Sequence, residues 1–422
     1  MKEDLLQFIW QYKLFDHTNL LTVNKQPIHI LNPGELNKDS GPDFFNSKIK
    51  IGNITLAGNV EIHVNAGDWN KHGHQNDAAY KNIVLHVVYK NDLKTPPVEN
   101  CEVLELKNHI NDSLIKKYES LINSKKALAC SGQINKIDSL KIQSWLNRML
   151  IERLEKKTEY IKQQFELCKN DYAQTFYIIL AKNFGFKTNT EPFENLARHL
   201  PLNLLLKHSN NLFQLEALLF GTAGLLDKSY KDKYLQQLQN EFEFLKSKYG
   251  IIPLNTGVWK FMRMRPANFP SVRMWQMAKL IHHSSNLFSE PQNFNHLNKL
   301  GKALQFEPEG YWQTHYNPGG KVQEKIGAMG MQSVENILIN TIAPFLFFYG
   351  KQSAKEHFTQ SALDCFEGTK FESNIKTRHF VKEGLKFKTS GESQALIHLF
   401  DNYCKNKHCL KCGIASQLLI KP

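Results

Sequence analysis

Residues 41–64 read GPDFFNSKIKIGNITLAGNVEIHV, and this stretch decides the fold. Two carboxylates, Asp43 and Glu61, and the imidazole of His63 are separated by a basic, β-rich spacer, which indicates a short hairpin. If residues 59–64 form a strand, Glu61 and His63 point to the same face, because successive side chains of a strand alternate between faces. Antiparallel pairing would then bring the carboxylate of Asp43 close to that of Glu61.

A metal ion is the predicted occupant of this hairpin. Two carboxylates that lie close together repel each other unless a divalent cation neutralises them, and hard oxygen ligands suit Mg²⁺ or Mn²⁺. Asp43 and Glu61 are therefore the predicted ligands of such a cation. Glu35, which precedes the hairpin, is a further acidic candidate.

The hairpin resembles the catalytic hairpin of the PD-(D/E)XK phosphodiesterase superfamily. Pro42-Asp43 matches the first part of that pattern and Glu61-Ile62 most of the second, but His63 stands where the superfamily usually has lysine. A histidine with an ordinary pKa near 6.5 could act as a base at neutral pH, although it is no fixed positive charge. The resemblance implies phosphodiester hydrolysis, with the missing charge supplied by a neighbouring lysine: Lys48, Lys50, Lys81 or Lys90.

The order of the predicted elements extends the resemblance. A helix over residues 3–12 precedes three β-rich runs, and a helix that begins at Asn76 leads to a strand over residues 83–89. This reproduces the helix, three-strand, helix, strand order of the nuclease core. Asn76 and Tyr80 are also similar to a Gln-x₃-Tyr motif of RecB-like members, with Asn in place of Gln.

The chain as a whole resembles an uncharacterised bacterial family known only as a domain of unknown function. That family has no assigned activity to carry over. The resemblance rests on segments spread along most of the length: GPDF (41–44), GNVEIHV (58–64), DWNKHGHQNDAAYKNIVLHVVY (68–89), WKFMRMRPANFPSVRMWQMAKL (259–280) and YCKNKHCLKCGI (403–414).

A second candidate site follows the hairpin. His72, His74 and Asp77 could bind a transition metal, because imidazole and carboxylate ligands suit zinc or manganese. These histidines could instead line the cleft of Glu61 or cap the helix. The group lacks the further acidic and histidine residues of a metallo-β-lactamase-like HxHxDH motif.

Composition and periodicity predict an α+β protein with two domains. At 422 residues, with 41% apolar and 22% charged residues, the chain should fold into more than one domain. Short β-rich runs continue to about residue 107, and a period of 3.6 dominates from residue 112 onward. We therefore expect a restriction-endonuclease-like mixed sheet core over residues 1–110 and a larger, mostly helical domain over residues 111–422.

The helical part contains a candidate nucleic-acid contact. The chain carries 53 Lys and Arg against 40 Asp and Glu, and this balance favours a polyanionic partner. Guanidinium groups among aromatic rings suit phosphate contacts and base stacking, although such residues can equally form salt bridges and core. The candidate residues are Lys260, Arg263, Arg265 and Arg273.

The C-terminal residues contain a candidate metal site. Cys404, Cys409 and Cys412 follow a C-x₄-C-x₂-C spacing, which indicates a metal site in a reducing compartment. A fourth ligand is needed. Cys365 would give four thiolates, suited to zinc or an iron–sulfur cluster, whereas His408 or His398 would give a Cys₃His zinc site.

The functional expectation combines these features. No signal peptide or apolar run of membrane-spanning length is apparent, so we expect a cytoplasmic protein without a membrane partner. The first hypothesis is metal-dependent phosphodiester hydrolysis on nucleic acid, with Asp43 and Glu61 as ligands and His63 acting on water. The alternatives are a non-catalytic nucleic-acid-binding or scaffold protein on a degenerate nuclease fold, and a small-molecule metallohydrolase using His72, His74 and Asp77.

Overall fold

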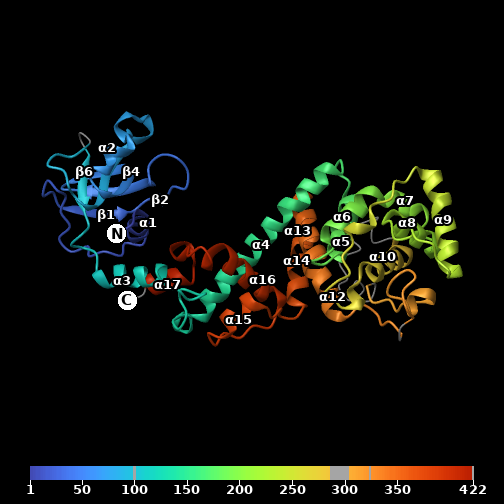
Figure 1. Ribbon diagram of the computed structural model, residues 1–422. Coiled ribbons are helices and arrows are strands. Elements are labelled where there is room, and N and C mark those ends of the chain that lie inside the picture. The colour runs from blue at the N-terminus through green and yellow to red at the C-terminus, as the bar shows by residue number, and fades with distance from the viewer. Residues whose placement is uncertain (98–100, 286–303, 323–324, 421–422) are drawn as a thin grey trace. The chain divides into compact units, whose positions relative to one another are not determined.

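The structure is a computed structural model that describes residues 1–97, 101–285, 304–322 and 325–420 (Figure 1). The chain forms two compact units. Unit 1 comprises Met1–Leu146, Ile375–Lys386 and Leu396–Pro422, and unit 2 comprises Asn147–Asn374 and Phe387–Ala395. Unit 1 thus contains the domain predicted over residues 1–110 and extends it by the segment that follows and by the end of the chain.

A mixed sheet forms the centre of unit 1. Its strand order is β1-β3-β4-β5-β6, with β2 paired to β3; β1, β3 and β4 pair antiparallel, whereas β4, β5 and β6 pair parallel. The strands are β1 (Ile28–Asn32), β2 (Glu35–Leu36), β3 (Phe44–Ile51), β4 (Ile54–Asn65), β5 (Ile83–Lys90) and β6 (Glu102–Glu105).

Parallel pairing of β4 and β5 requires a crossover, because a parallel partner cannot be reached by a tight turn. The crossover consists of the short helix α2 (Asp68–His72) and the 3₁₀ helices η1 (His74–Asn76) and η2 (Ala78–Tyr80). Gly58 allows β4 to lie close to the start of β5, because a Cβ at residue 58 would lie 2.4 Å from a methyl group of Val84. The crossover is the part of the fold that brings new side chains to the strand carrying Glu61.

Strand β4 is buried on both faces where it carries the candidate residues. Val60 and Ile62 are fully buried, and Glu61 and His63 on the alternate positions are only 5% and 1% exposed. Helix α1 (Glu3–Gln11) contacts β4, and α2 contacts it as well. The polar face is therefore an interior site, not the solvated side of a sheet.

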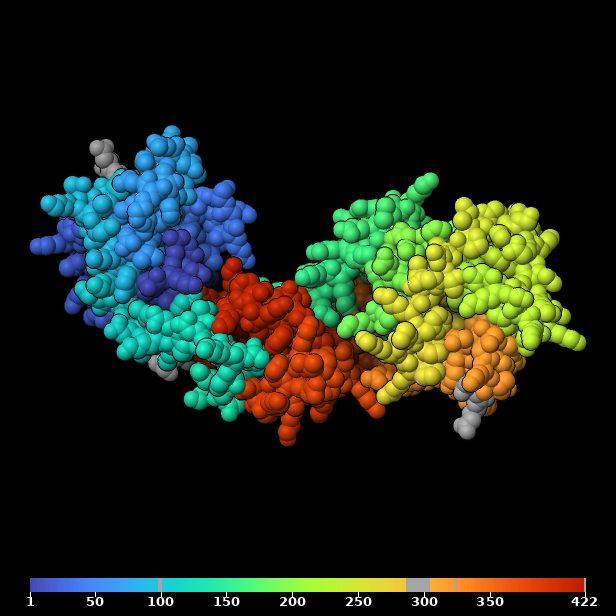
Figure 2. Space-filling view, in the orientation of Figure 1, coloured from blue at the N-terminus to red at the C-terminus, as the bar shows by residue number. Residues whose placement is uncertain are grey.

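The remaining elements of unit 1 come from the middle and the end of the chain. The C-terminal segment (red in Figure 2) lies beside the segment that follows the sheet (cyan), and Lys407 Nζ donates to the carbonyl oxygen of Ile122 at 2.7 Å. These elements are α3 (Asp112–Ile122), η3 (Ile134–Lys136), the first part of α4 (Ser139–Leu167), α15 (Ile375–Val381), the end of α16 (Ser390–Leu399), η10 (Phe400–Cys404), η11 (Cys409–Lys411) and α17 (Ala415–Ile420).

Unit 2 is helical and has a large apolar core of its own. Three of its helices are preceded by Asp171, Asn211 and Asp232, whose side chains accept a backbone N–H of the first turn and so cap the helix. Besides the rest of α4 and the start of α16, its elements are α5 (Tyr172–Phe184), α6 (Thr190–His199), α7 (Leu202–Lys207), α8 (Leu212–Thr222), α9 (Lys233–Tyr249), η4 (Thr256–Val258), η5 (Pro266–Asn268), α10 (Pro270–His283), η8 (Gly310–Gln313), α12 (Met331–Ile337), η9 (Leu338–Ile342), α13 (Ala343–Gln352) and α14 (Glu356–Glu367).

The α+β class is confirmed: a mixed sheet in the N-terminal part is followed by a mostly helical remainder. The predicted helix at the start of the chain and the predicted strand over residues 83–89 are present as α1 and β5, but no helix begins at Asn76, where the crossover consists of α2, η1 and η2, and the short strand β2 lies between β1 and β3. Among the described residues, no helix combines the length and the apolar character that a membrane crossing requires.

Candidate metal centre

Asp43 and Glu61 lie side by side, as the hairpin predicts, and each accepts a hydrogen bond from the other's strand. Phe44 pairs with Val60, which places the two acidic residues next to each other. The backbone N–H of Asp43 donates to Oε2 of Glu61 at 3.0 Å, and that of Ile62 donates to Oδ2 of Asp43 at 3.0 Å. The two carboxylates thus hold the two strands in register.

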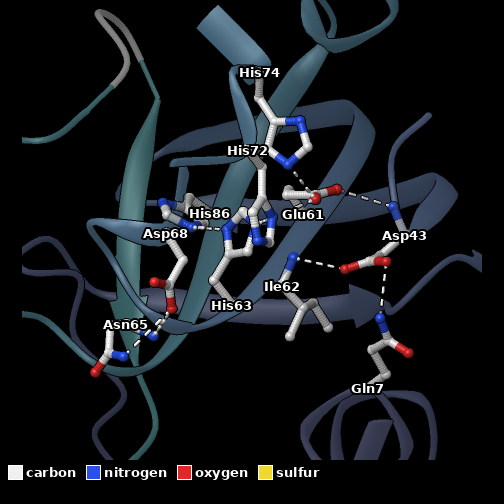
Figure 3. A network of polar contacts seen from close by, with 10 residues as sticks. All are labelled: Gln7, Asp43, Glu61, Ile62, His63, Asn65, Asp68, His72, His74 and His86. Atoms are coloured by element: carbon white, nitrogen blue, oxygen red, sulfur yellow. Dashed lines mark hydrogen bonds and ion pairs between the residues drawn. The ribbon is translucent and has the colours of Figure 1, made fainter. Parts of the chain in front are cut away.

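The remaining oxygen of Asp43 has a partner from helix α1. Gln7 Nε2 donates to Oδ1 of Asp43 at 2.8 Å. Figure 3 shows Asp43 turned toward Gln7 and Ile62, whereas Glu61 extends toward a group of imidazoles. Both oxygens of Asp43 are therefore engaged by N–H donors, and Oε1 of Glu61 is the carboxylate oxygen that faces the imidazoles.

Burial is the main influence on the protonation of these acids. It raises the pKa of Asp43 and the pKa of Glu61, and the negative charge of Asp43 raises the pKa of Glu61 further. The nearby carboxylate of Glu3 in α1 adds to both effects. A bound cation would offset this repulsion and favour the ionised forms.

Three imidazoles from different elements converge beside Glu61. His63 belongs to β4, His72 ends α2 and His74 begins η1. Nε2 of His63 lies 3.1 Å from Nδ1 of His72, and one ring nitrogen of each of the three histidines lies within 4.8 Å of the others. Oε1 of Glu61 lies 3.2 Å from Nε2 of His74 and 3.6 Å from Nε2 of His63 (Figure 3).

The turn between α2 and η1 aims two of these rings. Asp68 at the start of α2 accepts the backbone N–H of Asn65 at 3.0 Å, which fixes the helix to the end of β4. Trp69 is 1% exposed and anchors the helix in the interior. Gly73 has a φ of 76°, a left-handed conformation that glycine adopts without strain, and it reverses the chain between His72 and His74.

His86 on β5 supports the group from behind. Its Nε2 lies 2.9 Å from Nδ1 of His63, while Nε2 of His63 faces His72. A hydrogen bond to one ring nitrogen fixes the tautomer of an imidazole and leaves the other nitrogen available as a ligand. His86 therefore orients His63 toward the position between the three histidines and Glu61.

Among the described residues, three nitrogens in and around the centre are buried without a hydrogen bond: Nε2 of His74, Nδ1 of His86 and Nε1 of Trp69. Nε2 of His74 is buried and makes none in the described structure, although Oε1 of Glu61 lies 3.2 Å away. Buried polar atoms normally have a hydrogen-bond partner, and a cation bound between this nitrogen and the carboxylate of Glu61 would satisfy both. The donor set fits a metal.

Burial favours the neutral, metal-binding form of His63, His74 and His86. Burial, followed by the neighbouring imidazoles, lowers the pKa of His63 to about 3. Burial likewise lowers the pKa of His86 to about 4 and that of His74 below its ordinary value. The interpretation of His63 as a base with a pKa near 6.5 does not fit this environment, because an imidazole with so low a pKa is a weak base.

The other candidates from the sequence lie around the centre without joining it. Asp77 is exposed and caps η2, accepting the backbone N–H of Ala79 at 2.9 Å. The ring of Tyr80 stacks on that of His74 with centroids 4.0 Å apart, and burial raises the pKa of Tyr80 to about 12. Glu35 is exposed on β2 beside Phe45.

The four lysines considered from the sequence lie away from the two carboxylates in ion-pairing terms. Lys48, Lys81 and Lys90 are exposed and Lys50 is partly exposed. Within the described residues, none of the four forms an ion pair with Asp43 or Glu61.

The candidate nucleic-acid residues in unit 2 divide into two kinds. Lys260, Arg263 and Arg265 are exposed. Arg273 is 3% exposed, donates to Gln276 at 2.7 Å and Asn268 at 2.5 Å, and lies over the ring of Phe186. The prediction that Arg273 contacts nucleic acid is therefore wrong, because its guanidinium is part of the interior.

The cysteines of the tail are placed as follows. Cys409 and Cys412 are buried, Cys404 is partly buried, and all three belong to unit 1. Cys365, one proposed fourth ligand, lies in α14 within the apolar core of unit 2. His408 is exposed, with Nδ1 lying 3.1 Å from the carbonyl oxygen of Asn402, and Nδ1 of His398 lies 3.2 Å from the amide of Asn402.

Sequence reasoning assigned His72 and His74 either to a separate metal site with Asp77 or to the cleft of Glu61, and the structure places them beside Glu61 and His63. Glu61 and His63 came from the hairpin, and His72 and His74 from the stretch after it. Gln7 and Glu3 were missed, and no local signal marks them, since an acidic, amphipathic N-terminal helix is common on protein surfaces. The return of α2 and η1 over β4 is a tertiary feature.

Comparison with known proteins gives a family but no function. No curated protein and no solved structure matches the chain. The family described as "Protein of unknown function (DUF2851)" matches residues 3–375, which is most of the 422 residues, and the chain therefore belongs to that family.

Proposed function

We propose that this protein is a metal-dependent hydrolase of phosphodiester bonds in nucleic acid, with its metal held by Glu61, His63, His72 and His74. The observation that carries the proposal is the convergence of Oε1 of Glu61 with a ring nitrogen from each of the three histidines. Three imidazoles and one carboxylate favour Zn²⁺ or Mn²⁺ over Mg²⁺, which prefers oxygen ligands.

This assignment changes the roles expected from the hairpin alone. Asp43 holds Glu61 in place through their shared backbone contacts, and Glu61 supplies the carboxylate ligand. His63 is a ligand and His86 orients it. A metal bound there would lower the pKa of a coordinated water and so provide a nucleophile at neutral pH.

The access of solvent supports a catalytic over a purely structural site. His72 is exposed, whereas His63 is buried and His74 is partly buried. A site with an exposed ligand can admit water and substrate, as catalytic metal sites require.

The choice of phosphodiesters rests on two further observations. The order of an acidic residue before β3 and a Glu-x-His on β4 resembles the PD-(D/E)XK pattern, with His63 in place of its lysine. The formal charge of +13 favours a polyanionic substrate. Both support nucleic acid over a neutral small molecule.

One observation favours a second candidate, a non-catalytic nucleic-acid-binding scaffold. The described structure pairs no lysine with Asp43 or Glu61, and His63 occupies the position of the lysine. In that case the histidines would hold a structural metal or none, and the protein would bind nucleic acid without cutting it.

The experiment measures metal content and cleavage together. Wild-type protein, loaded with Zn²⁺ or Mn²⁺, is assayed on single- and double-stranded DNA and RNA and on a small chromogenic phosphodiester. His72→Gln and His74→Gln should each lose bound metal and cleavage. His29→Gln is the matched control, since His29 is an exposed histidine on β1 of the same sheet.

The outcomes separate the candidates. Cleavage of a nucleic acid that is lost in both variants and kept in the control supports the proposal. Metal binding without cleavage of any nucleic acid favours the scaffold, and cleavage of the chromogenic compound alone favours a small-molecule hydrolase. A wild-type protein that binds neither metal tightly would refute the metal centre itself.

A further inference from the structure

The sheet face that carries Glu61 and His63 extends beyond the metal centre. Strand β4 pairs irregularly with its neighbours at two places, and at both the extra residue belongs to the neighbouring strand, so the alternation of side chains along β4 is unbroken. The other residues of β4 on this face are therefore Thr55, Ala57 and Asn59. Thr55 and Ala57 are exposed, so this part of the face is open to solvent.

A bulge in β3 places two lysines on the same face. Between Phe44 and Lys48, β3 contains one residue more than the segment of β4 opposite it, and Asn46 there has a φ of 56°. A regular strand would put Lys48 and Lys50 on the face of Phe44, which is fully buried. The extra residue turns both lysines to the opposite face, which is the face of Glu61.

The strand register gives the same assignment. Lys48 is paired with Ala57 and Lys50 with Thr55, and residues paired across antiparallel strands share a face. Lys48 is exposed and Lys50 is partly exposed, whereas Ile49 between them is fully buried. The residues opposite both lysines on β1 and β4 carry no negative charge. The two lysines thus form a positive surface, which we call the lysine patch.

The lysine patch lies along the same strand pair as the metal centre. Ala57, opposite Lys48, precedes Glu61 by four residues, which is about 13 Å at the usual rise of a strand. The two lysines are two residues apart, or about 7 Å along β3. Phosphates of B-DNA follow one another about every 3.4 Å along each strand, so a nucleic acid with one phosphodiester at the metal would place others beside both lysines about four to six nucleotides further on. An ammonium group binds a phosphate as a point charge.

We propose that Lys48 and Lys50 bind the phosphate backbone of the nucleic-acid strand whose phosphodiester is held at the metal centre. This inference rests on the proposed function and adds the surface that holds a polymeric substrate. The role differs from that of the lysine in the PD-(D/E)XK pattern, since both side chains would contact phosphates several nucleotides from the reacting one. A small phosphodiester would reach the metal without touching the lysine patch.

The test compares a polymer with a small substrate. Lys48→Gln, Lys50→Gln and the double variant are measured beside Lys116→Gln, which removes the same charge from an exposed position on α3 of the same unit. Fluorescence anisotropy without added metal gives the affinity for labelled single- and double-stranded oligonucleotides over a salt series. The slope of log affinity against log salt should fall by about one for each lysine replaced, and Lys48→Arg, which keeps the charge, should bind as the wild type does.

Cleavage in the presence of Zn²⁺ or Mn²⁺ supplies the second comparison. The KM for a nucleic acid should rise in the double variant while kcat is retained, because the lysines lie away from the reacting phosphate. Metal affinity and cleavage of the chromogenic phosphodiester should equal those of the wild type. Loss of either in the double variant would locate the defect at the metal centre and overturn the inference.

The binding results separate this inference from the proposed function. A wild type that cuts nucleic acid, with equal oligonucleotide affinity in the double variant and in Lys116→Gln, overturns the inference and leaves the hydrolase standing. A wild type that cuts no nucleic acid, but whose affinity and salt slope fall in the double variant alone, supports the lysine patch and refutes the hydrolase. A wild type that binds no oligonucleotide overturns the inference.

A footprint of the wild type gives the same answer without substitutions. Acetylation of exposed lysines, read by mass spectrometry, should find Lys48 and Lys50 protected when an oligonucleotide is bound, and Lys116 modified equally with and without it. Equal modification of Lys48 and Lys50 in the free protein and in the complex would show that the strand does not cross this face, and would overturn the inference.

Discussion

Oε1 of Glu61 lies 3.2 Å from Nε2 of His74, although the first residue is on a strand and the second begins a 3₁₀ helix after the next turn. The other oxygen of Glu61 accepts the backbone N–H of Asp43 at 3.0 Å. One carboxylate therefore connects the hairpin to the group of histidines. This connection makes a single centre out of residues that the sequence shows as two separate patterns.

Glu61→Gln should abolish tight binding of Zn²⁺ or Mn²⁺, because it removes the charged ligand while keeping the shape of the side chain. The loss in metal affinity should exceed the roughly 10- to 100-fold that follows removal of an outer-shell partner. Isothermal titration calorimetry of the purified variant with each metal measures it.

Asp43→Asn tests whether Asp43 is itself a metal ligand or only holds Glu61 in place. Asp43 is engaged by Gln7 and Ile62, so it acts on the metal through Glu61, and the variant should lose only about 10- to 100-fold in affinity. If Asp43→Asn and Glu61→Gln lose the same affinity, and Mg²⁺ supports binding as well as Zn²⁺ does, the two carboxylates themselves hold the metal.

His86→Gln should reduce the affinity for the metal about 10- to 100-fold without removing a ligand. Nε2 of His86 lies 2.9 Å from Nδ1 of His63 and fixes the orientation of that ring. Tyr80→Phe is the control, because it keeps the ring that stacks on His74. Unchanged affinity in His86→Gln would show that His63 needs no support or is not a ligand.

Gly73→Ala should cost about 1 kcal/mol of folding stability and should also reduce the affinity for the metal. The φ of 76° is unfavourable for a residue with a Cβ, even though the added methyl group would meet no atom within 4 Å. Relief of this strain would rotate His72 and His74 away from His63. Gly327→Ala, where φ is not in the left-handed region and space is also open, controls for the loss of glycine. Chemical denaturation and metal titration give the two quantities.

The sheet and the hairpin could be predicted because their signals are local. The alternation of Val60, Glu61, Ile62 and His63 indicates a strand and its two faces, and the order of elements along the chain follows from changes in periodicity. The burial of the polar face of this strand could not be predicted from local signals. Glu61 and His63 are buried because α2 and η1 return over them, and that packing depends on contacts between distant residues.

Burial also explains why the roles predicted for His63 and Arg273 do not fit their environments. The predicted base, His63, has a lowered pKa because three imidazoles and the interior surround it. Arg273 looks like a phosphate contact in the sequence, but it is enclosed by Asn268, Gln276 and Phe186. Sequence shows the type of a side chain, whereas its protonation and partners depend on the packing around it.

Stability should depend on pH through Glu216 of unit 2. Burial raises the pKa of Glu216 to about 7 from its ordinary 4.5. Between these values the folded chain keeps a proton that the unfolded chain has released, so the free energy of unfolding should fall as pH rises through this window. The fall is about 3 kcal/mol at most, since a tenfold change in proton affinity corresponds to about 1.4 kcal/mol.

Glu216→Gln should remove this contribution, because glutamine can still accept from Tyr234 and Trp312 but does not titrate. The measurement is urea denaturation of the wild type and the variant at about pH 5 and about pH 8. The free energy of unfolding should fall less in the variant than in the wild type between the lower and the higher pH. An identical pH dependence in both proteins would show that Glu216 is ionised throughout.

Arg273→Ala should reduce folding stability, whereas Arg265→Ala should affect only nucleic-acid binding, because Arg273 is buried and Arg265 is exposed. Arg273→Ala removes the three side-chain hydrogen bonds of a charged group and its contact with Phe186, which should cost roughly 2 to 4 kcal/mol of stability. Arg265→Ala should leave stability unchanged.

If Arg265 touches a phosphate, binding should weaken for every nucleic-acid sequence alike, and the slope of log affinity against log salt should fall by about one. Fluorescence anisotropy with labelled single- and double-stranded oligonucleotides over a salt series measures both. Lys246→Ala is a matched control, since that lysine is in unit 2 and is paired with Glu243. An unchanged salt slope in Arg265→Ala, with binding intact, would remove this arginine from the nucleic-acid surface and leave Lys260 and Arg263 as its remaining candidates.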